Sequence, residues 1–188
     1  MESFRWLAIT FSMILGLGVT RVLSGVVAVL RSRRHATIDW IPLAWAASIF
    51  VLQLQFWWAL IELANVERSW RLGDFLLLLG VPLALFAAAA FLLPSSELAP
   101  EESLAESFEH NRPFALGCLS LYAVLALLVD RALFGMDGFQ LAHVYLVLEV
   151  AVPLVVLRPV PRPAMAGATL FYLALVAWSS WALSPKVY

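Results

Sequence analysis

Arg21 stands inside a long apolar segment, where a charged side chain is costly unless it faces protein or water and has a partner. It lies ten residues before Arg31, which is about 15 Å along a helix and half of a ~30 Å hydrocarbon core. Its neighbours at helical spacing, Gly18, Ser24 and Gly25, are small enough to let another helix approach closely. The pattern predicts that Arg21 points into a helix bundle, as an anion-binding or coupling site or as half of a buried ion pair.

Glu149 is the acidic residue that matches Arg21 in depth, because it lies ten residues into a later apolar segment that starts near Phe139. Tyr145 lies one turn before Glu149 on the same helix face and is placed to hydrogen-bond to it. Pairing with Arg21 would keep Glu149 ionised, whereas an unpaired Glu149 would tend to bind a proton. We therefore expect an Arg21–Glu149 ion pair, with a proton relay as the alternative use of Glu149.

A second set of polar residues recurs every seven positions in another apolar segment: Ser48, Gln55 and Glu62. This spacing places them on one face of a helix, and Gln53 with Trp57 occupies an adjoining face. Polar stripes of this kind either seal a helix interface by hydrogen bonding or line an aqueous cavity. The sequence leaves both interpretations open.

A third polar group is expected where the chain meets water. Glu62 reaches the same membrane face as Asp130, Arg131 and His143 if the apolar segments cross the bilayer in turn. The group is interpreted as a water-exposed network, and the sharper hypothesis is a titrating gate, because histidine changes charge near neutral pH.

Several chemistries find no support in the sequence. It contains no phosphate-binding glycine loop, no zinc-ligand spacing and no serine-hydrolase or zinc-protease motif. Of the histidines His35, His110 and His143, only the last is well placed in an apolar segment, so haem ligation by two histidines of one chain is not expected. The sequence therefore predicts no metal site and identifies no cofactor. An intramembrane enzyme built from Glu62, His143 and Asp130 is the least favoured interpretation.

The elements that must hold these residues follow from composition. Hydrophobic residues make up 63% of the chain, charged residues only 13%, and the mean hydropathy is +0.89. A soluble domain has roughly 25% charged residues and could not hide so much apolar surface, whereas lipid can solvate it. The sequence predicts an all-α polytopic membrane helix bundle, a single transmembrane domain over residues 1–188. Its six expected spans cover about 4–30, 40–64, 75–93, 113–134, 139–157 and 164–183.

An acidic segment at 95–111 is the one extended polar stretch. Leu104 and Phe108 have i, i+4 spacing, which indicates a short surface helix within it. With few apolar residues to bury, the segment is predicted to be mobile, protease-sensitive and the platform on which another protein docks.

Charge gives a first view of orientation and partners. Basic residues divide five against six between the two faces, and the cluster from Arg31 to Arg34 beside the first span favours a cytoplasmic loop there. An even number of spans then places both termini on the opposite side. No basic surface suits nucleic acid. The expected partners are the lipid bilayer and either further copies of the chain or a larger membrane complex, in a bacterial-type inner (plasma) membrane.

Two functions follow from these patterns. A transport or channel-like protein would use the Arg21 and Glu149 layer and the polar stripe as its pathway, and six spans would favour oligomerisation. A non-catalytic accessory or assembly subunit would dock through lipid-facing aromatic residues and the acidic segment. The first is favoured, because an accessory subunit needs no charges in the middle of the membrane.

Overall fold

The described residues of the computed structural model, 2–63, 71–134 and 141–183, confirm the predicted all-α class. Six helices follow one another along the chain: α1 (Glu2–Ser32), α2 (Trp40–Leu63), α3 (Leu72–Leu92), α4 (Leu104–Phe134), α5 (Leu141–Val155) and α6 (Arg162–Leu183). Each helix corresponds to one expected span, and all but α5 are long and apolar enough to cross a membrane. The 15 residues of α5 cover about 22 Å at 1.5 Å per residue, so a full crossing by α5 stays a prediction.

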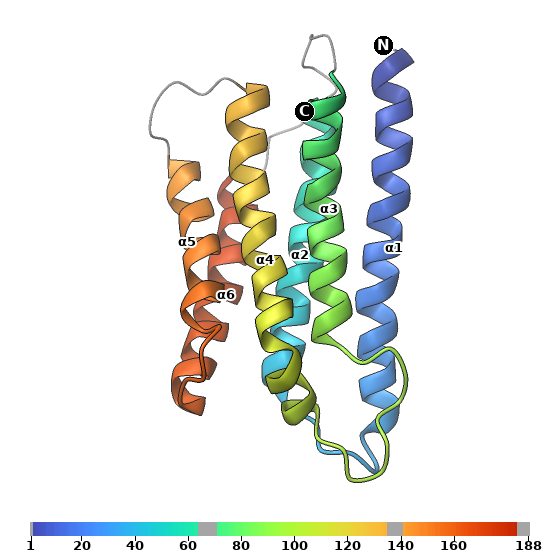
Figure 1. The fold of residues 1–188 in the computed structure, drawn as a ribbon, viewed down its shortest axis with the longest axis vertical. Helices are drawn as coiled ribbons and strands as arrows, with labels where there is room; N and C mark the ends of the chain where they lie inside the picture. Colours follow the sequence, from blue (N-terminus) through green and yellow to red (C-terminus); the bar gives the residue numbers. More distant parts are fainter. Residues whose placement is uncertain (1, 64–70, 135–140, 184–188) are drawn as a thin grey trace.

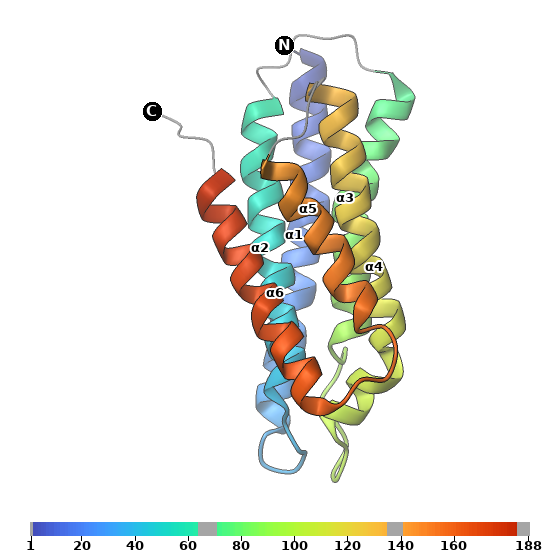
Figure 2. The same ribbon diagram turned by 90° about the vertical axis from the view of Figure 1, so that its left-hand side faces the viewer.

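The helices alternate in direction and form a closed ring in the order α1, α3, α4, α5, α6, α2 (Figures 1 and 2). The α2 helix also contacts α3 and α4, which brings it toward the centre of the ring. The first turn of α1 and the last turn of α6 lie at the same end, here called the upper end, at the top of Figure 1. The connections 33–39, 93–103 and 156–161 lie at the opposite, lower end.

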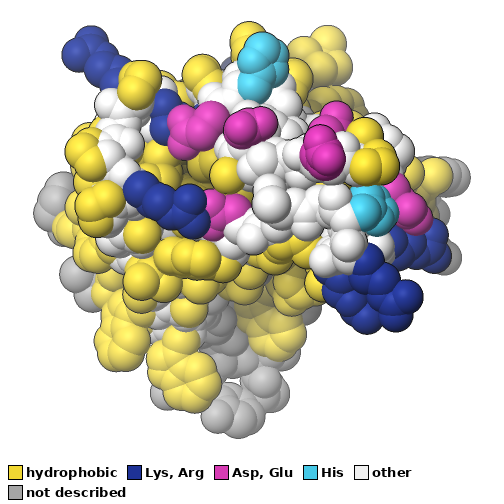
Figure 3. All heavy atoms as spheres, turned by 90° about the horizontal axis from the view of Figure 1, so that it is seen from below, with side chains coloured by type: hydrophobic (Ala, Val, Ile, Leu, Met, Phe, Trp, Pro, Cys, Tyr) yellow, Lys and Arg dark blue, Asp and Glu magenta, His cyan; other side chains and the backbone are white. Residues whose placement is uncertain are grey.

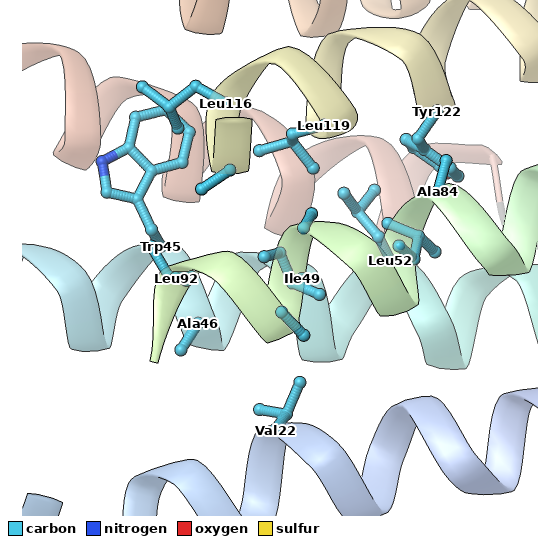
Figure 4. Packing of buried hydrophobic residues seen from close by; sticks show 14 of the residues in the cluster. Val22, Trp45, Ala46, Ile49, Leu52, Ala84, Leu92, Leu116, Leu119 and Tyr122 are labelled. Carbon is cyan, nitrogen blue, oxygen red and sulfur yellow. The ribbon is translucent and has the colours of Figure 1, made fainter. Parts of the chain in front are cut away.

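Apolar side chains of α2, α3 and α4 fill the space between the helices (Figure 4). Trp45, Ile49 and Leu52 of α2 meet Leu116 and Leu119 of α4, and all five are at most 1% exposed. Large apolar side chains also cover the outside of the bundle, as lipid-facing surfaces require. The buried and the exposed apolar residues together explain the unusual composition.

The acidic segment is more ordered than its composition predicts. The α4 helix begins at Leu104 and continues through Pro113, so the expected surface helix and the expected fourth span are one helix. Leu104 is 0% and Phe108 3% exposed, which shows that these two residues face the bundle and do not form an outward docking surface.

The rest of the acidic segment is tied to the connection between α1 and α2. The Thr37 N–H donates to the Glu102 carbonyl at 3.1 Å, and the Leu104 N–H donates to the Thr37 carbonyl at 3.0 Å. The Leu98 N–H donates to Ser32 Oγ at 2.8 Å, and Leu98 is itself buried. The two connections satisfy each other's backbone groups, which argues against a mobile loop, while its protease sensitivity stays a prediction.

Charged side chains gather over this lower end, whereas the flanks visible beside it are largely apolar (Figure 3). Asp39 caps α2, since its Oδ1 accepts from the Ile41 N–H at 3.1 Å. The Asp39 carboxylate also pairs with Arg162 at 2.9 Å and so links the beginnings of α2 and α6. This end of the bundle is held by polar contacts that an apolar core alone would not supply.

The alternating helix directions predict which residues face the same side of a membrane. In a Cys118→Ala background, single cysteines at Arg33 and Arg158 should label from one side with a membrane-impermeant maleimide. Cysteines at Arg71 and Trp181 should label from the other side. All four positions are exposed, so accessibility depends only on sidedness. Labelling of position 158 together with position 71, and of position 181 together with position 33, would show that α5 does not cross.

Candidate functional site

Arg21 caps the carboxyl end of α3. Its guanidinium donates to the backbone carbonyls of Ala90 at 3.1 Å, Leu93 at 2.5 Å and Pro94 at 3.4 Å. The last carbonyls of a helix lack partners within the helix, and a cation there also interacts favourably with the helix dipole. These contacts give Arg21 a structural role, which explains why a charged residue lies in an apolar helix.

The predicted Arg21–Glu149 ion pair was wrong for two reasons. First, α3 ends at the level of Arg21, and segment 93–103 continues downward beside the last turns of α1 (Figure 1). Counting residues from Arg31 therefore overestimated how far Arg21 lies from polar groups. Second, α1 and α5 lie on opposite sides of the ring, with the other helices between them. The equal depth of Arg21 and Glu149 in the sequence did not mean that their helices are neighbours.

The small residues beside Arg21 do permit close packing, as predicted. A Cβ added to Gly25 would lie 2.7 Å from the Leu93 Cβ, at the end of α3 that Arg21 caps. A Cβ added to Gly18 would lie 2.7 Å from Gln53 Nε2 of α2. Gly25 is needed for the close approach of α3 to α1, whereas the contact at Gly18 involves the end of a flexible side chain that can shift.

Glu149 is buried between α5, α4 and α6, with 2% of its surface exposed. Ser179 Oγ of α6 donates to Glu149 Oε1 at 3.1 Å. Tyr122 of α4 and Tyr172 of α6 lie close enough for the charge of Glu149 to act on them. We call these four residues the Glu149 cluster. It consists of one carboxyl group that is hydrogen-bonded to a serine hydroxyl, with two buried tyrosines nearby.

No basic side chain of the described residues forms an ion pair with Glu149. The Tyr172 hydroxyl has no hydrogen-bond partner among the described residues, although Tyr172 is fully buried and its ring packs 4.8 Å from that of Trp45. An ionised carboxylate in such surroundings is costly unless a cation compensates it. Binding a proton removes that cost, so the cluster is suited to a change of protonation.

Tyr145 does not hydrogen-bond to Glu149 as predicted. Its hydroxyl accepts from Trp178 Nε1 at 2.8 Å, which joins α5 to α6. Ser180 Oγ donates to Gln55 Oε1 at 3.2 Å and joins α6 to α2. Tyr145 and Gln55 therefore serve contacts between helices that flank the Glu149 cluster.

The polar stripe of α2 does not act as one unit within the described part of the chain. Ser48 is fully buried and donates to the Ala44 carbonyl of its own helix at 3.1 Å. Gln53 is 1% exposed, and neither polar atom of its amide has a hydrogen-bond partner in the described ranges. The side chain of Glu62 lies outside the described residues. Ser48 and Gln53 lie in buried packing, which favours the helix-interface interpretation for them.

Asp130 and His143 do come together at the upper end. His143 Nε2 lies 3.6 Å from Asp130 Oδ2, and the side chains are 5% and 23% exposed respectively. Arg131 is exposed on α4. The predicted interfacial group is therefore an Asp130–His143 contact with a neighbouring arginine.

Sequence reasoning missed Ser179, Tyr122 and Tyr172 of the Glu149 cluster. All three lie in apolar helices where single hydroxyl residues are common, so no spacing distinguishes them. The pair of serines at 179 and 180 was the available signal, because both donate across helix interfaces. Among the described residues, no group of three or more His, Cys, Asp or Glu could hold a metal ion. No protein-family model, curated protein or solved structure matches this chain.

The capping role of Arg21 predicts its mutational behaviour. Arg21→Met should destabilise the protein by about 3 kcal/mol, because hydrogen bonds from a charged group to carbonyls are worth ~1.5–3 kcal/mol. Arg21→Lys should recover part of this loss, since it keeps the charge but not the guanidinium fork. In a cycle with Glu149→Leu, measured by unfolding in one detergent, losses should add within about 0.5 kcal/mol. A larger interaction energy would contradict the separation of these residues.

The contact between Ser179 and Glu149 predicts the opposite result. Ser179→Ala and Glu149→Leu should show an interaction energy of about 0.5–3 kcal/mol in the same assay, because the residues share a hydrogen bond that either change removes. The matched control is Thr169→Val, which removes a buried α6 hydroxyl that donates to the Met165 carbonyl. This control should be additive with Glu149→Leu. Equal coupling in both cycles would show a general loosening of α6.

Proposed function

We propose that this membrane protein is a small proton-coupled transport protein in which Glu149 binds and releases the proton. The observation that carries the proposal is the Glu149 cluster, a buried carboxyl group that has hydroxyl neighbours and no described cationic partner. Ionisable groups inside membrane spans are rare and commonly mark substrate or proton pathways. Arg21, which has a structural role, no longer supports the proposal.

The chemistry of the cluster favours a proton over a metal cation. Calcium takes six to eight oxygen ligands, and charged carboxylates supply much of its affinity. The Glu149 cluster holds one carboxyl group, and its other oxygens are neutral hydroxyls. A proton needs only the carboxylate itself, and the Ser179 contact can persist in both protonation states.

The backbone around Glu149 supports movement at this point. Pro153 lies within α5 four residues after Glu149, and proline has no N–H to donate to the Glu149 carbonyl. The α5–α6 contact is also less extensive than the contact of α5 with α4. A bend in α5 that loosens the α6 side would bring Glu149 toward water, as alternating access to a coupling group requires.

The accessory-subunit interpretation is the second candidate, and a specific observation favours it. Four exposed tryptophans lie near the upper ends of the adjacent helices α2 and α6: Trp57, Trp58, Trp178 and Trp181. Aromatic residues are enriched both at membrane interfaces and in contacts with other proteins. Assembly with further copies of the chain, and residence in a bacterial-type inner membrane, stay predictions under either function.

Charge movement tests the proposal directly. Proteoliposomes adsorbed on a solid-supported membrane should show a transient charge displacement after a pH jump, since a proton reaches a buried site. Glu149→Gln keeps the shape of the side chain but cannot ionise, so the displacement should fall to that of protein-free liposomes. Glu106→Gln is the matched control, because it makes the same change at an exposed acid of α4.

A full displacement in Glu149→Gln would overturn the role of Glu149. An absent displacement in the unaltered protein would overturn the transport proposal and favour the accessory subunit. Intact folding of each variant is checked by its unfolding temperature in the same detergent.

A further inference from the structure

An open groove lies at the lower end of α1, far from the Glu149 cluster. It is lined by Val27, Leu30, Arg31, Arg33 and Arg34, and its volume is about 350 Å³. Basic side chains gather at the edge of the lower end where α1 terminates (Figure 3). The groove therefore combines a basic rim with an apolar wall.

The positive charge of this groove is largely uncompensated. Arg33 and Arg34 are exposed and form no ion pair with a residue in the described ranges. Arg31 pairs with Glu97 at 3.8 Å, but both side chains are more than half exposed. Exposed pairs of this kind contribute little and are easily exchanged. The groove therefore offers two free guanidinium groups and a third that is weakly held.

The apolar wall continues upward along the outer face of α1. Leu23, Val27 and Leu30 are spaced at i, i+4 and i+7, so they form one stripe, and they are 51%, 46% and 45% exposed. The apolar span of α1 runs from Ile9 to Ser32, so the stripe faces lipid and the groove lies at its boundary with water. Among the helices, α1 packs chiefly on α2 and α3, which leaves this face open.

We propose that the groove binds an anionic phospholipid. Its phosphate lies among Arg33, Arg34 and Arg31, and one acyl chain lies along the stripe of Leu23, Val27 and Leu30. Guanidinium groups bind phosphate oxygens in pairs, and basic clusters beside a transmembrane helix attract anionic lipids. A free phosphate would use the arginines but gain nothing from the apolar wall, and an acidic protein would not lie within the lipid-facing stripe.

The experiment uses the full chain in phosphatidylcholine bilayers with trace spin-labelled phosphatidylglycerol or spin-labelled phosphatidylcholine. The fraction of motionally restricted label gives the relative association constant of each lipid with the protein. The unaltered protein should prefer phosphatidylglycerol. Arg33→Gln and Arg34→Gln should each reduce that preference about fivefold at most, which corresponds to the ~1 kcal/mol expected for one basic residue near an anionic surface.

Arg158→Gln is the matched control, because it removes one exposed arginine from the same end of the bundle but outside the groove. It should leave the preference unchanged. Val27→Ser with Leu30→Ser tests the apolar wall and should weaken phosphatidylglycerol binding although all charges remain. Both residues are exposed, so the fold should survive.

Three results would overturn the proposal. One is an equal loss in Arg158→Gln, which would indicate attraction by overall charge. Another is displacement of the restricted phosphatidylglycerol by soluble glycerol 3-phosphate, which would indicate a site for small anions. The third is equal restriction of both lipids by the unaltered protein. Because Glu149 takes no part in this site, none of these results bears on the transport proposal.

Discussion

Backbone groups near lipid must find their partners within the protein, and this constraint shapes the bundle. The carboxyl end of α3 satisfies it through Arg21, which donates to the carbonyls of Leu93 and two neighbouring residues. The beginning of α2 satisfies it through Asp39. The connections 33–39 and 93–103 satisfy it by bonding to each other. Arg21 therefore lies in the apolar helix α1 because it satisfies the carbonyls at the end of α3.

Two parts of the bundle differ in how firmly their polar groups are held. Around α1, the close contacts involve Gly18 and Gly25, and Arg21 is bound to fixed carbonyls. Around α5, Glu149 is bound to a hydroxyl and lies beside a missing backbone hydrogen bond at Pro153. The first arrangement resists movement, because loosening it would leave carbonyls and a guanidinium without partners. The second arrangement can change with less loss of hydrogen bonding.

Sequence patterns predicted the helices better than their contacts. The expected spans 40–64, 75–93 and 164–183 agree closely with α2, α3 and α6, because apolar runs of sufficient length have few alternatives in a membrane. The start of α4 was misplaced at Pro113 because its first nine residues are polar in composition. Leu104 and Phe108 are the exceptions, and their burial against the bundle decides the structure there.

Site residues were harder to predict, for a physical reason. Position along a helix gives depth, but the identity of the neighbouring helix depends on packing that no single segment encodes. Arg21 and Glu149 matched in counted depth and yet lie on helices at opposite sides of the ring. Tyr122 and Tyr172 join Glu149 only because α4 and α6 both adjoin α5. By contrast, Asp130 and His143 lie at the ends of consecutive helices, so their contact followed from chain order.

Gln53 and Glu149 are both buried and have no ion-pair partner among the described residues, and they differ in a way that bears on function. Gln53 has an amide without hydrogen bonds, which costs free energy but cannot change its charge. Its amide lies against Gly18 of α1. Glu149 can exist in two protonation states whose stability depends on how much water reaches it. Only a side chain that can change its protonation state, as Glu149 can, is able to couple a proton gradient to helix movement. The transport proposal therefore rests on Glu149 alone.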